Sequence, residues 1–284
     1  MKKWALALEG GSLRCMFTAG VTDVLMEHRL WANSIFGVSA GALTGVSYVS
    51  EQIGRTAQIN LDYVNDKRYL GWGNLIFKKS IFNFDFLFGE ISDKLVPLDW
   101  DAFAQSEIKF TAVCTDCLTG RPAFFEKHSC DEIYKAIRAS ASLPLLSPIV
   151  EVEGGPYVDG GVSCSIPFAQ PMKEGYDKVV VVTTREHGYR KPQVPRALAK
   201  LYAKHYREYP RLVQALLDTP RRYDRELEEL DRLEAAGEIF VLRPPEPVTV
   251  SRTEKDVTKL RELYAQGRRT CLEHLEGLEH YLNN

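Results

Sequence analysis

The stretch "SIFGVSAGALTGVSYVS", residues 34–50, indicates the fold class of this chain. Its first part, up to Ser39, is a short and nearly continuous apolar run, as in a strand that is buried on both faces of a parallel sheet. The part that follows is rich in small residues, which allow a helix to pack closely on its neighbours. A strand that passes directly into such a helix is the repeating unit of an α/β fold.

Four other runs have the same strand-like character. They are "WALALE" (4–9), "IKFTAVCT" (108–115), "DKVVVVTT" (177–184) and "EIFVLRP" (238–244). After the first of them, apolar residues recur at helical spacing over "CMFTAGVTDVLMEHRL" (15–30). This alternation predicts an α/β fold with three α/β/α layers and a mainly parallel central sheet.

The composition changes after about residue 190, where charged helical segments follow. The prolines that should separate these helices are Pro195, Pro210 and Pro220. A last helix should begin near "SRTEKDV", because Ser251 and Glu254 have the spacing of a capping box. We therefore expect an α/β core over residues 1–190 and a helical C-terminal extension over residues 191–284, packed on the same domain.

Composition and charge indicate the general class of the protein. The 284 residues are 45% hydrophobic and carry a formal net charge of −2, which suits one large core and gives no sign of nucleic-acid binding. The charge is uneven, because residues 185–225 contain eleven Lys and Arg against four Asp and Glu. Such a segment can contact anionic lipid headgroups or phosphates, although the solvated faces of charged helices are the simpler explanation.

The N-terminal "MKKWALALEGG" resembles a signal peptide, but Glu9 interrupts its apolar run too early. No stretch approaches the roughly 18 to 20 apolar residues that are needed to cross a bilayer. We expect a soluble, cytoplasmic protein whose membrane contact, if any, is peripheral and at the inner face. The sequence does not indicate an oligomeric state.

The six cysteines are scattered, unlike a compact disulfide framework. Cys114 and Cys117 form a Cys-x-x-Cys pair, but this pair ends a strand-like run and leads into a turn, whereas a redox pair should open a helix. A second such pair for zinc is absent from the sequence. We expect these cysteines to be packing residues, and we expect no metal and no cofactor.

Ser39 lies at the junction of the predicted strand and helix, with Gly37 and Gly41 on either side. This Gly-x-Ser-x-Gly pattern is typical of a nucleophile elbow, a tight turn that projects the serine hydroxyl at the carboxyl edge of the sheet. The helix that follows directs its N-terminal amides and dipole at developing negative charge. The pattern alone is common, so an ordinary strand–helix junction is the alternative.

The first strand ends in "EGGSLRCMFTAG" (9–20), where Gly10 and Gly11 form an amide-rich loop at the start of a helix. Their spacing fits neither a P-loop nor a dinucleotide fingerprint. Because neighbouring parallel strands end side by side, the loop can donate N–H groups to an oxyanion formed at Ser39. A glycine turn made for close packing is the alternative.

A third motif, "YVDGGVSCSIP" (157–167), places Asp159 before Gly160 and Gly161, in a loop that looks like a hairpin tip. A lone Asp-Gly-Gly is usually a turn. In kind and order, however, the three motifs resemble the patatin-like phospholipase family. That family has a glycine-rich oxyanion loop with a basic residue, a Gly-x-Ser-x-Gly nucleophile and a distant Asp-Gly-Gly/Ala. The resemblance extends over about residues 4–186.

The resemblance implies a serine lipid acyl hydrolase, a phospholipase or esterase that acts through an acyl-enzyme without a metal. It makes Ser39 the nucleophile and Asp159 the base that activates it, so that no histidine is required. The residues that it assigns to the oxyanion hole are Gly10, Gly11 and Ser12, with Arg14 nearby. Ser12 and Cys15 stand where the family usually has glycine. A serine leaves the backbone amide able to donate if its φ is negative, whereas the side chain of Cys15 can narrow this hole.

The partner implied is a lipid or other ester substrate. Seven aromatic residues in segment 69–91 can line an acyl-chain channel, touch a bilayer or simply fill the core: Tyr69, Trp72, Phe77, Phe82, Phe84, Phe86 and Phe88. Within this segment, "NFDFLFG" (83–89) alternates like a half-buried strand. Two other functions stay open: a non-catalytic, lipid-binding member of the family, and a Ser–His esterase or acyltransferase with His187 as its best-placed histidine.

Overall fold

The centre of the molecule is an eight-stranded sheet with the order β5-β6-β3-β2-β1-β7-β8, in which β4 also pairs with β3. The computed structural model describes residues 2–71, 73–74 and 80–284. Its strands are β1 (Trp4–Leu8), β2 (Ser34–Val38), β3 (Lys109–Asp116), β4 (Pro122–Glu126), β5 (Val150–Val152), β6 (Gly155–Asp159), β7 (Lys178–Val182) and β8 (Phe240–Leu242). Mixed α/β architecture, as predicted, is therefore confirmed.

The parallel part of the sheet consists of the five strands that the apolar runs predict. β1 pairs in parallel with β2 and β7, β3 with β2, and β8 with β7. Every residue of β1 and β2 is buried, as expected for strands that are covered on both faces. The sequence did not predict β4, β5 and β6, which are antiparallel and lie at the other side of β3.

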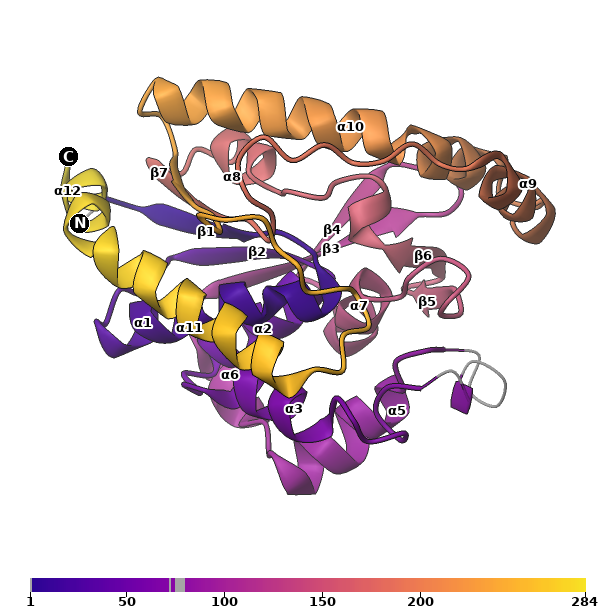
Figure 1. The fold of residues 1–284 in the computed structure, drawn as a ribbon, viewed down its shortest axis with the longest axis horizontal. Coiled ribbons are helices and arrows are strands. Elements are labelled where there is room, and N and C mark those ends of the chain that lie inside the picture. Colours follow the sequence, from indigo (N-terminus) through magenta and orange to yellow (C-terminus); the bar gives the residue numbers. More distant parts are fainter. Residues whose placement is uncertain (1, 72, 75–79) are drawn as a thin grey trace.

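Helices cover both faces of this sheet (Figure 1). The helices are α1 (Met16–Glu27), α2 (Ala40–Val49), α3 (Arg55–Tyr63), α5 (Phe84–Phe86), α6 (Trp100–Gln105), α7 (Ile133–Ser140), α8 (Ala169–Lys173), α9 (Arg196–His205), α10 (Pro210–Ala235), α11 (Val257–Glu273) and α12 (Leu275–Asn283). Two 3₁₀ turns, η1 (Ser12–Cys15) and η3 (Gly160–Val162), and one π-helix, η2 (Leu87–Leu95), complete the described part. No helix of that part is both long and apolar enough to cross a bilayer.

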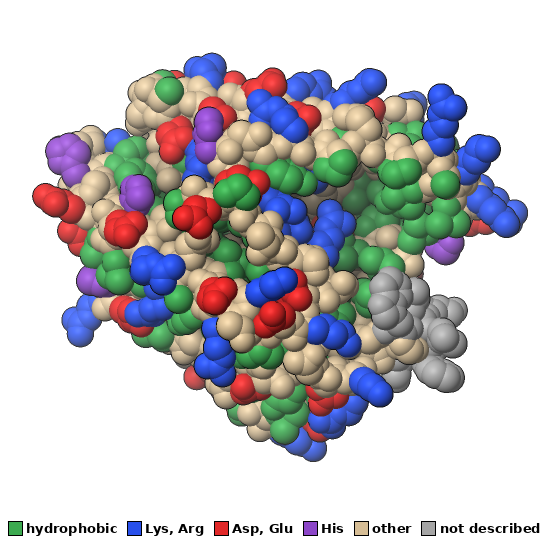
Figure 2. All heavy atoms as spheres, in the orientation of Figure 1, with side chains coloured by type: hydrophobic (Ala, Val, Ile, Leu, Met, Phe, Trp, Pro, Cys, Tyr) green, Lys and Arg blue, Asp and Glu red, His purple; other side chains and the backbone are tan. Residues whose placement is uncertain are grey.

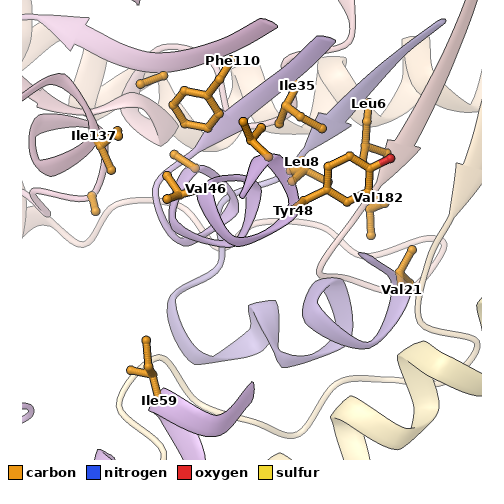
Figure 3. Close-up of a cluster of buried hydrophobic side chains, with 14 of the residues drawn as sticks. Leu6, Leu8, Val21, Ile35, Val46, Tyr48, Ile59, Phe110, Ile137 and Val182 are labelled. Carbon is orange, nitrogen blue, oxygen red and sulfur yellow. The ribbon is translucent and has the colours of Figure 1, made fainter. Parts of the chain in front are cut away.

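Alternate residues of the strands point to two separate cores. On one face, Leu6, Leu8 and Val182 join the main core beneath α1, α2 and α11, which Figure 3 shows from close by. On the other face, Ala7 and Val181 pack under α10. This alternation is what gives the molecule its three layers, because each face of the sheet must be covered by helices.

The C-terminal region differs from the sequence prediction in two details. Pro220 does not end a helix but lies inside α10, whereas Pro195 and Pro210 do precede or begin helices. Ser251 does not cap the helix that begins after it, α11: the carboxylate of Asp256 accepts the N–H groups of Thr258 and Lys259. A carboxylate directly before the first turn competes better for these amides than a serine hydroxyl placed five residues earlier.

The C-terminal region is also built into the core. Its strand β8 extends the main sheet beside β7, and α11 packs along α1. Gly20 of α1 lies against α11, and Gly267 of α11 lies against α1. A Cβ on Gly20 would overlap the carbonyl oxygen of Tyr264. A Cβ on Gly267 would likewise overlap the carbonyl oxygen of Phe17. The two helices therefore approach to backbone contact at this point.

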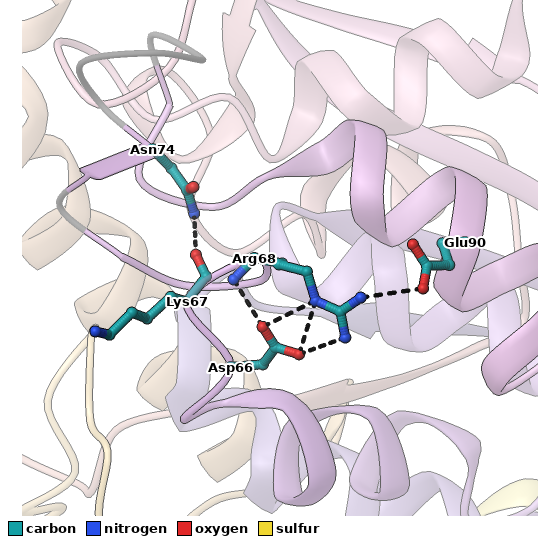
Figure 4. A network of polar contacts seen from close by, with 5 residues as sticks. All are labelled: Asp66, Lys67, Arg68, Asn74 and Glu90. Carbon is teal, nitrogen blue, oxygen red and sulfur yellow. Dashed lines mark hydrogen bonds and ion pairs between the residues drawn. The ribbon is translucent and has the colours of Figure 1, made fainter.

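Residues 83–89, which alternate like a strand, are helical in the structure and form α5 and the start of η2. The side chain of Asn83 accepts the N–H of Phe86 and so caps this helix. Figure 4 shows how the preceding turn is held to η2: Arg68 binds Asp66 at 2.8 Å and Glu90 at 3.1 Å, while Asn74 donates to the carbonyl oxygen of Lys67. Trp72 and Phe77 of the aromatic segment lie outside the described residues.

Candidate active site

Ser39 occupies the turn between β2 and α2, and its backbone is strained. Its φ of 56° and ψ of −126° are unusual for a residue with a side chain, and such a conformation costs on the order of 1–3 kcal/mol. Gly37 and Gly41 have no room for a side chain, because a Cβ would lie 2.5 Å from the Cα of Ala42 or 2.6 Å from the carbonyl oxygen of Leu8. The turn therefore fits the predicted elbow.

A serine that the sequence did not single out holds this turn in place. The hydroxyl of Ser140, at the end of α7, accepts the N–H of Ser39 at 2.9 Å and donates to the carbonyl oxygen of Val113 at 2.6 Å. It therefore links the elbow to β3. The sequence around Ser140, "SAS" (140–142), contains no motif that indicates this role.

Asp159 lies within hydrogen-bonding distance of Ser39, although 120 residues separate the two in the chain. The Ser39 hydroxyl donates to Oδ2 of Asp159 at 2.7 Å, and the N–H of Gly161 donates to Oδ1 at 2.8 Å. Burial raises the pKa of the Asp159 carboxyl above its usual range, against the effect of these two hydrogen bonds. A buried carboxylate in this position is a stronger base than an exposed one.

The expected position of Asp159 at a hairpin tip is wrong. β5 and β6 do form a hairpin, but its turn is at Glu153 and Gly154, and Asp159 lies at the opposite end of β6. There it pairs with Cys114 of β3. Gly160 follows because a Cβ at that position would overlap the carbonyl oxygen of Val113.

The glycine loop after β1 lies against the elbow. A Cβ on Gly10 would be 3.0 Å from the Cβ of Ser39, and one on Gly11 would be 2.7 Å from the hydroxyl of Thr184. The N–H of Gly10 donates to Ser165, whereas those of Gly11 and Ser12 have no acceptor among the described residues. Gly11 and Ser12 are therefore better placed than Gly10 to bind an oxyanion.

Ser12 keeps the backbone conformation of a glycine, with a φ of 50°. A residue with a side chain adopts this left-handed conformation at some cost in strain. Cys15 is buried and donates its thiol to the carbonyl oxygen of Glu9. Both side chains line a cavity next to Ser39, so the two departures from glycine change the shape of the site directly.

Two cavities meet at Ser12 and Ser39. The first is narrow, about 80 Å³, and is mostly apolar. It extends between α2, α3 and η2. Its apolar lining is Leu13, Ala40, Leu43, Val46, Ile59, Tyr69, Phe82, Phe84, Leu87, Phe88, Leu98, Ala141 and Leu143. Four of the seven aromatic residues noted in the sequence thus border this cavity.

The second cavity is larger, about 670 Å³, and more polar. Asp159 lines it together with cations from distant parts of the chain: Arg14, Arg185, Lys191 and Arg252. In Figure 2, Lys and Arg side chains gather around the hollow in the middle of this face. The sequence drew attention to Arg14 only, and to residues 185–225 only as a charged surface.

The other candidate residues lie elsewhere or are inert. His187 is exposed, and its Nε2 is 3.4 Å from Asp231 rather than near Ser39. Cys114 is buried in β3, where burial raises the pKa of its thiol well above the usual range. Within the described ranges, no three His, Cys, Asp or Glu side chains lie together as metal ligands would.

Two sequence profiles match the chain. The one described as patatin-like phospholipase matches residues 6–172, and one described as a domain of unknown function (DUF6363) matches residues 209–283. The first includes the elbow, the glycine loop and Asp159, and it matches more than half of the chain.

The chain is also similar in sequence to individual proteins. The chain is 26% identical to the uncharacterized protein YjjU of Escherichia coli over 93% of this chain and 74% of that protein. It is 27% identical to an uncharacterized NTE family protein of Mycobacterium bovis over 63% of this chain and 48% of that protein. It is 30% identical to the human 1-acylglycerol-3-phosphate O-acyltransferase PNPLA3 over 58% of this chain and 35% of that protein.

A solved structure shows the same fold. The crystal structure of VipD from Legionella pneumophila aligns with a TM-score of 0.55, covering 97% of this chain and 67% of that one. The sequences are 12% identical, so the likeness concerns the fold alone.

Proposed function

The chain belongs to the patatin-like phospholipase family, and from this premise we propose that it is a serine lipid acyl hydrolase with a Ser39–Asp159 dyad. Family membership supports a general role in lipid hydrolysis. The observation that carries the finer proposal is the 2.7 Å hydrogen bond from the Ser39 hydroxyl to Asp159. Ser39 lies on a strained elbow, beside the amides of Gly11 and Ser12, which have no acceptor in the described part of the chain.

In the proposed reaction, Oδ2 of Asp159 takes the proton of Ser39 as Oγ attacks the ester carbonyl carbon. The N–H groups of Gly11 and Ser12 bind the oxyanion that forms. When the carbonyl reforms, the bond to the alcohol breaks and Asp159 returns the proton to the leaving oxygen. Asp159 then takes a proton from water, whose oxygen attacks the acyl-enzyme. Asp159 returns this proton to Oγ of Ser39 as the acyl bond breaks and the free acid leaves.

The two cavities suggest how an ester lies in the site. The first carbons of an acyl chain suit the narrow apolar cavity, and transfer of each buried methylene from water is favourable by about 0.8 kcal/mol. The alcohol part then lies in the larger polar cavity. Since both cavities include Ser39, the ester bond would be at their junction.

A fluorophosphonate probe tests whether Ser39 is a nucleophile. We expect the purified chain to be labelled at one residue, Ser39, and Ser39→Ala to remain unlabelled. The labelled enzyme should also lose its release of free acid from a short-chain ester. A folded chain that neither reacts with the probe nor releases acid would instead be a non-catalytic member of the family. Transfer of the acyl group to added glycerol without free acid would contradict hydrolysis.

The length of the preferred acyl chain should depend on Leu43, which lines the apolar cavity one helical turn after Ser39. Leu43→Phe narrows this cavity, so kcat/KM for dodecanoyl esters should fall about tenfold or more relative to butanoyl esters. Ile53→Phe makes the same kind of change at an exposed position and serves as the control. Equal losses on both esters would mean that the cavity does not hold the chain.

The pH profile should reflect the buried base. Hydrolysis needs Asp159 ionised, and burial raises the pKa of Asp159 above the ordinary 3.8. Activity should therefore fall on the acid side, with the midpoint of kcat/KM above that value. Circular dichroism at each pH separates loss of activity from unfolding. A profile that is flat down to the ordinary pKa would argue against Asp159 as the base.

A further inference from the structure

Four cations from separate parts of the chain line the larger cavity. Arg14 follows β1, Arg185 and Lys191 follow β7, and Arg252 comes from the segment between β8 and α11. Arg252 belongs to the region that the second profile matches, so this region contributes directly to the wall of the cavity that contains Ser39.

These cations lack a direct carboxylate partner in the part of the chain that the structure describes. Among the described residues, none of the four forms an ion pair with a carboxylate. The Nε atoms of Arg14 and Arg185 are buried and lack any partner in that part of the chain. Lys191 lies over the ring of Tyr223, and burial lowers the pKa of its ammonium to about 8. Arg14 is buried, Arg185 and Lys191 are half-buried, and Arg252 is exposed at the mouth. Cations that converge on a cavity with no ion-pair partner in the described part of the chain are costly, so their convergence suggests an anionic ligand.

The nearby carboxylates are already engaged by the wall. Glu9, which also lines the cavity, accepts the N–H of Thr184 and the hydroxyl of Tyr223. Glu226 accepts the N–H groups of Ser165 and Ile166. These hydrogen bonds point the two carboxylates at the protein. Apart from the N–H groups of Gly11 and Ser12 beside Ser39, the charged donors that the described part of this wall offers a ligand are those of the four cations.

We propose that Arg14, Arg185, Lys191 and Arg252 form a subsite for a phosphate monoester, so that the substrates are acyl esters that carry a terminal phosphate. This rests on the proposed function and specifies its substrate class. A phosphate monoester has a charge of about −1.5 to −2 at pH 7 and three acceptor oxygens. A zwitterionic headgroup would bring an ammonium towards the same four cations, which disfavours it.

Binding can be tested without turnover in the full-length Ser39→Ala protein. By calorimetry, decanoyl glycerol 3-phosphate should bind at least about tenfold more tightly than inorganic phosphate, because its chain also fills the apolar cavity. Equal affinities would mean that free phosphate is the ligand and would overturn the lipid assignment. Adding Arg252→Gln or Lys191→Gln should weaken both ligands about tenfold or more. Lys255→Gln, an exposed cation of the same segment outside the cavity, should change neither affinity.

Turnover provides the second readout. The parent enzyme should hydrolyse decanoyl glycerol 3-phosphate with at least about tenfold higher kcat/KM than its phosphocholine counterpart, and both cavity variants should reduce this ratio towards one. A ratio near one in the parent, or one that neither variant changes, would overturn the subsite. If no ester is hydrolysed, the proposed function fails, while the calorimetric result still decides whether the phosphate subsite exists.

Discussion

Asp159→Asn should lower kcat/KM for ester hydrolysis about as much as Ser39→Ala does, on the order of 10³-fold or more. Asparagine keeps the shape of the side chain and can still accept the 2.7 Å hydrogen bond from Ser39, but its amide oxygen cannot take up the proton. Because the two residues act as one unit, the double variant should be hardly less active than either single variant.

His187→Gln is the matched control for the base, because His187 is the histidine that the sequence ranks highest and the structure places it on the surface beside Asp231. We expect it to retain most of the activity. Melting temperatures should show that all variants are folded. A folded, inactive His187→Gln together with an active Asp159→Asn would replace the dyad with a Ser–His mechanism.

The largest expected effect on stability is at the contact between α1 and α11. Gly267→Ala should lower the free energy of unfolding by about 3 kcal/mol, because its Cβ would overlap the backbone of Phe17 and the helices must separate. Gly20→Ala should act in the same way. Since both changes push the same two helices apart, their combined effect should be smaller than the sum. Urea unfolding measures each value.

Gly277→Ala is the control for this prediction. Gly277 lies in α12, and its Cβ would have only the ring of Phe240 as a neighbour, at 3.9 Å. Alanine is favoured over glycine in a helix by about 1 kcal/mol, so this variant should be neutral or more stable. A Gly267→Ala protein as stable as the parent would mean that α11 does not pack on α1 in the way described.

The sequence predicted the parallel strands because burial on both faces leaves a continuous apolar run, as in "KVVVV" of β7. It did not predict β5, whose three residues are too short and too exposed to give a pattern. It was wrong about Pro220, because tertiary packing of α10 on the sheet outweighs the local preference against a proline inside a helix.

For the candidate site, sequence motifs were sufficient to bring Ser39, Asp159 and the glycine loop together as a hypothesis. They could not identify Lys191 and Arg252 as neighbours of these residues. A cation at the surface and a cation in a cavity look alike in a sequence, and here the distinction depends on how the segments after β7 and β8 cross the edge of the sheet.

The position of β1 in the sheet has a consequence for synthesis of the protein. β1 lies between β2 and β7, so one edge of this wholly buried strand has no partner until residue 182 has been added. At typical synthesis rates, about 7 to 29 s separate completion of β2 from completion of β7. During this interval the growing chain exposes an unpaired apolar edge, which is a template for aggregation. The nascent protein should therefore depend on chaperones that shield its first strand until the middle of the chain has been translated.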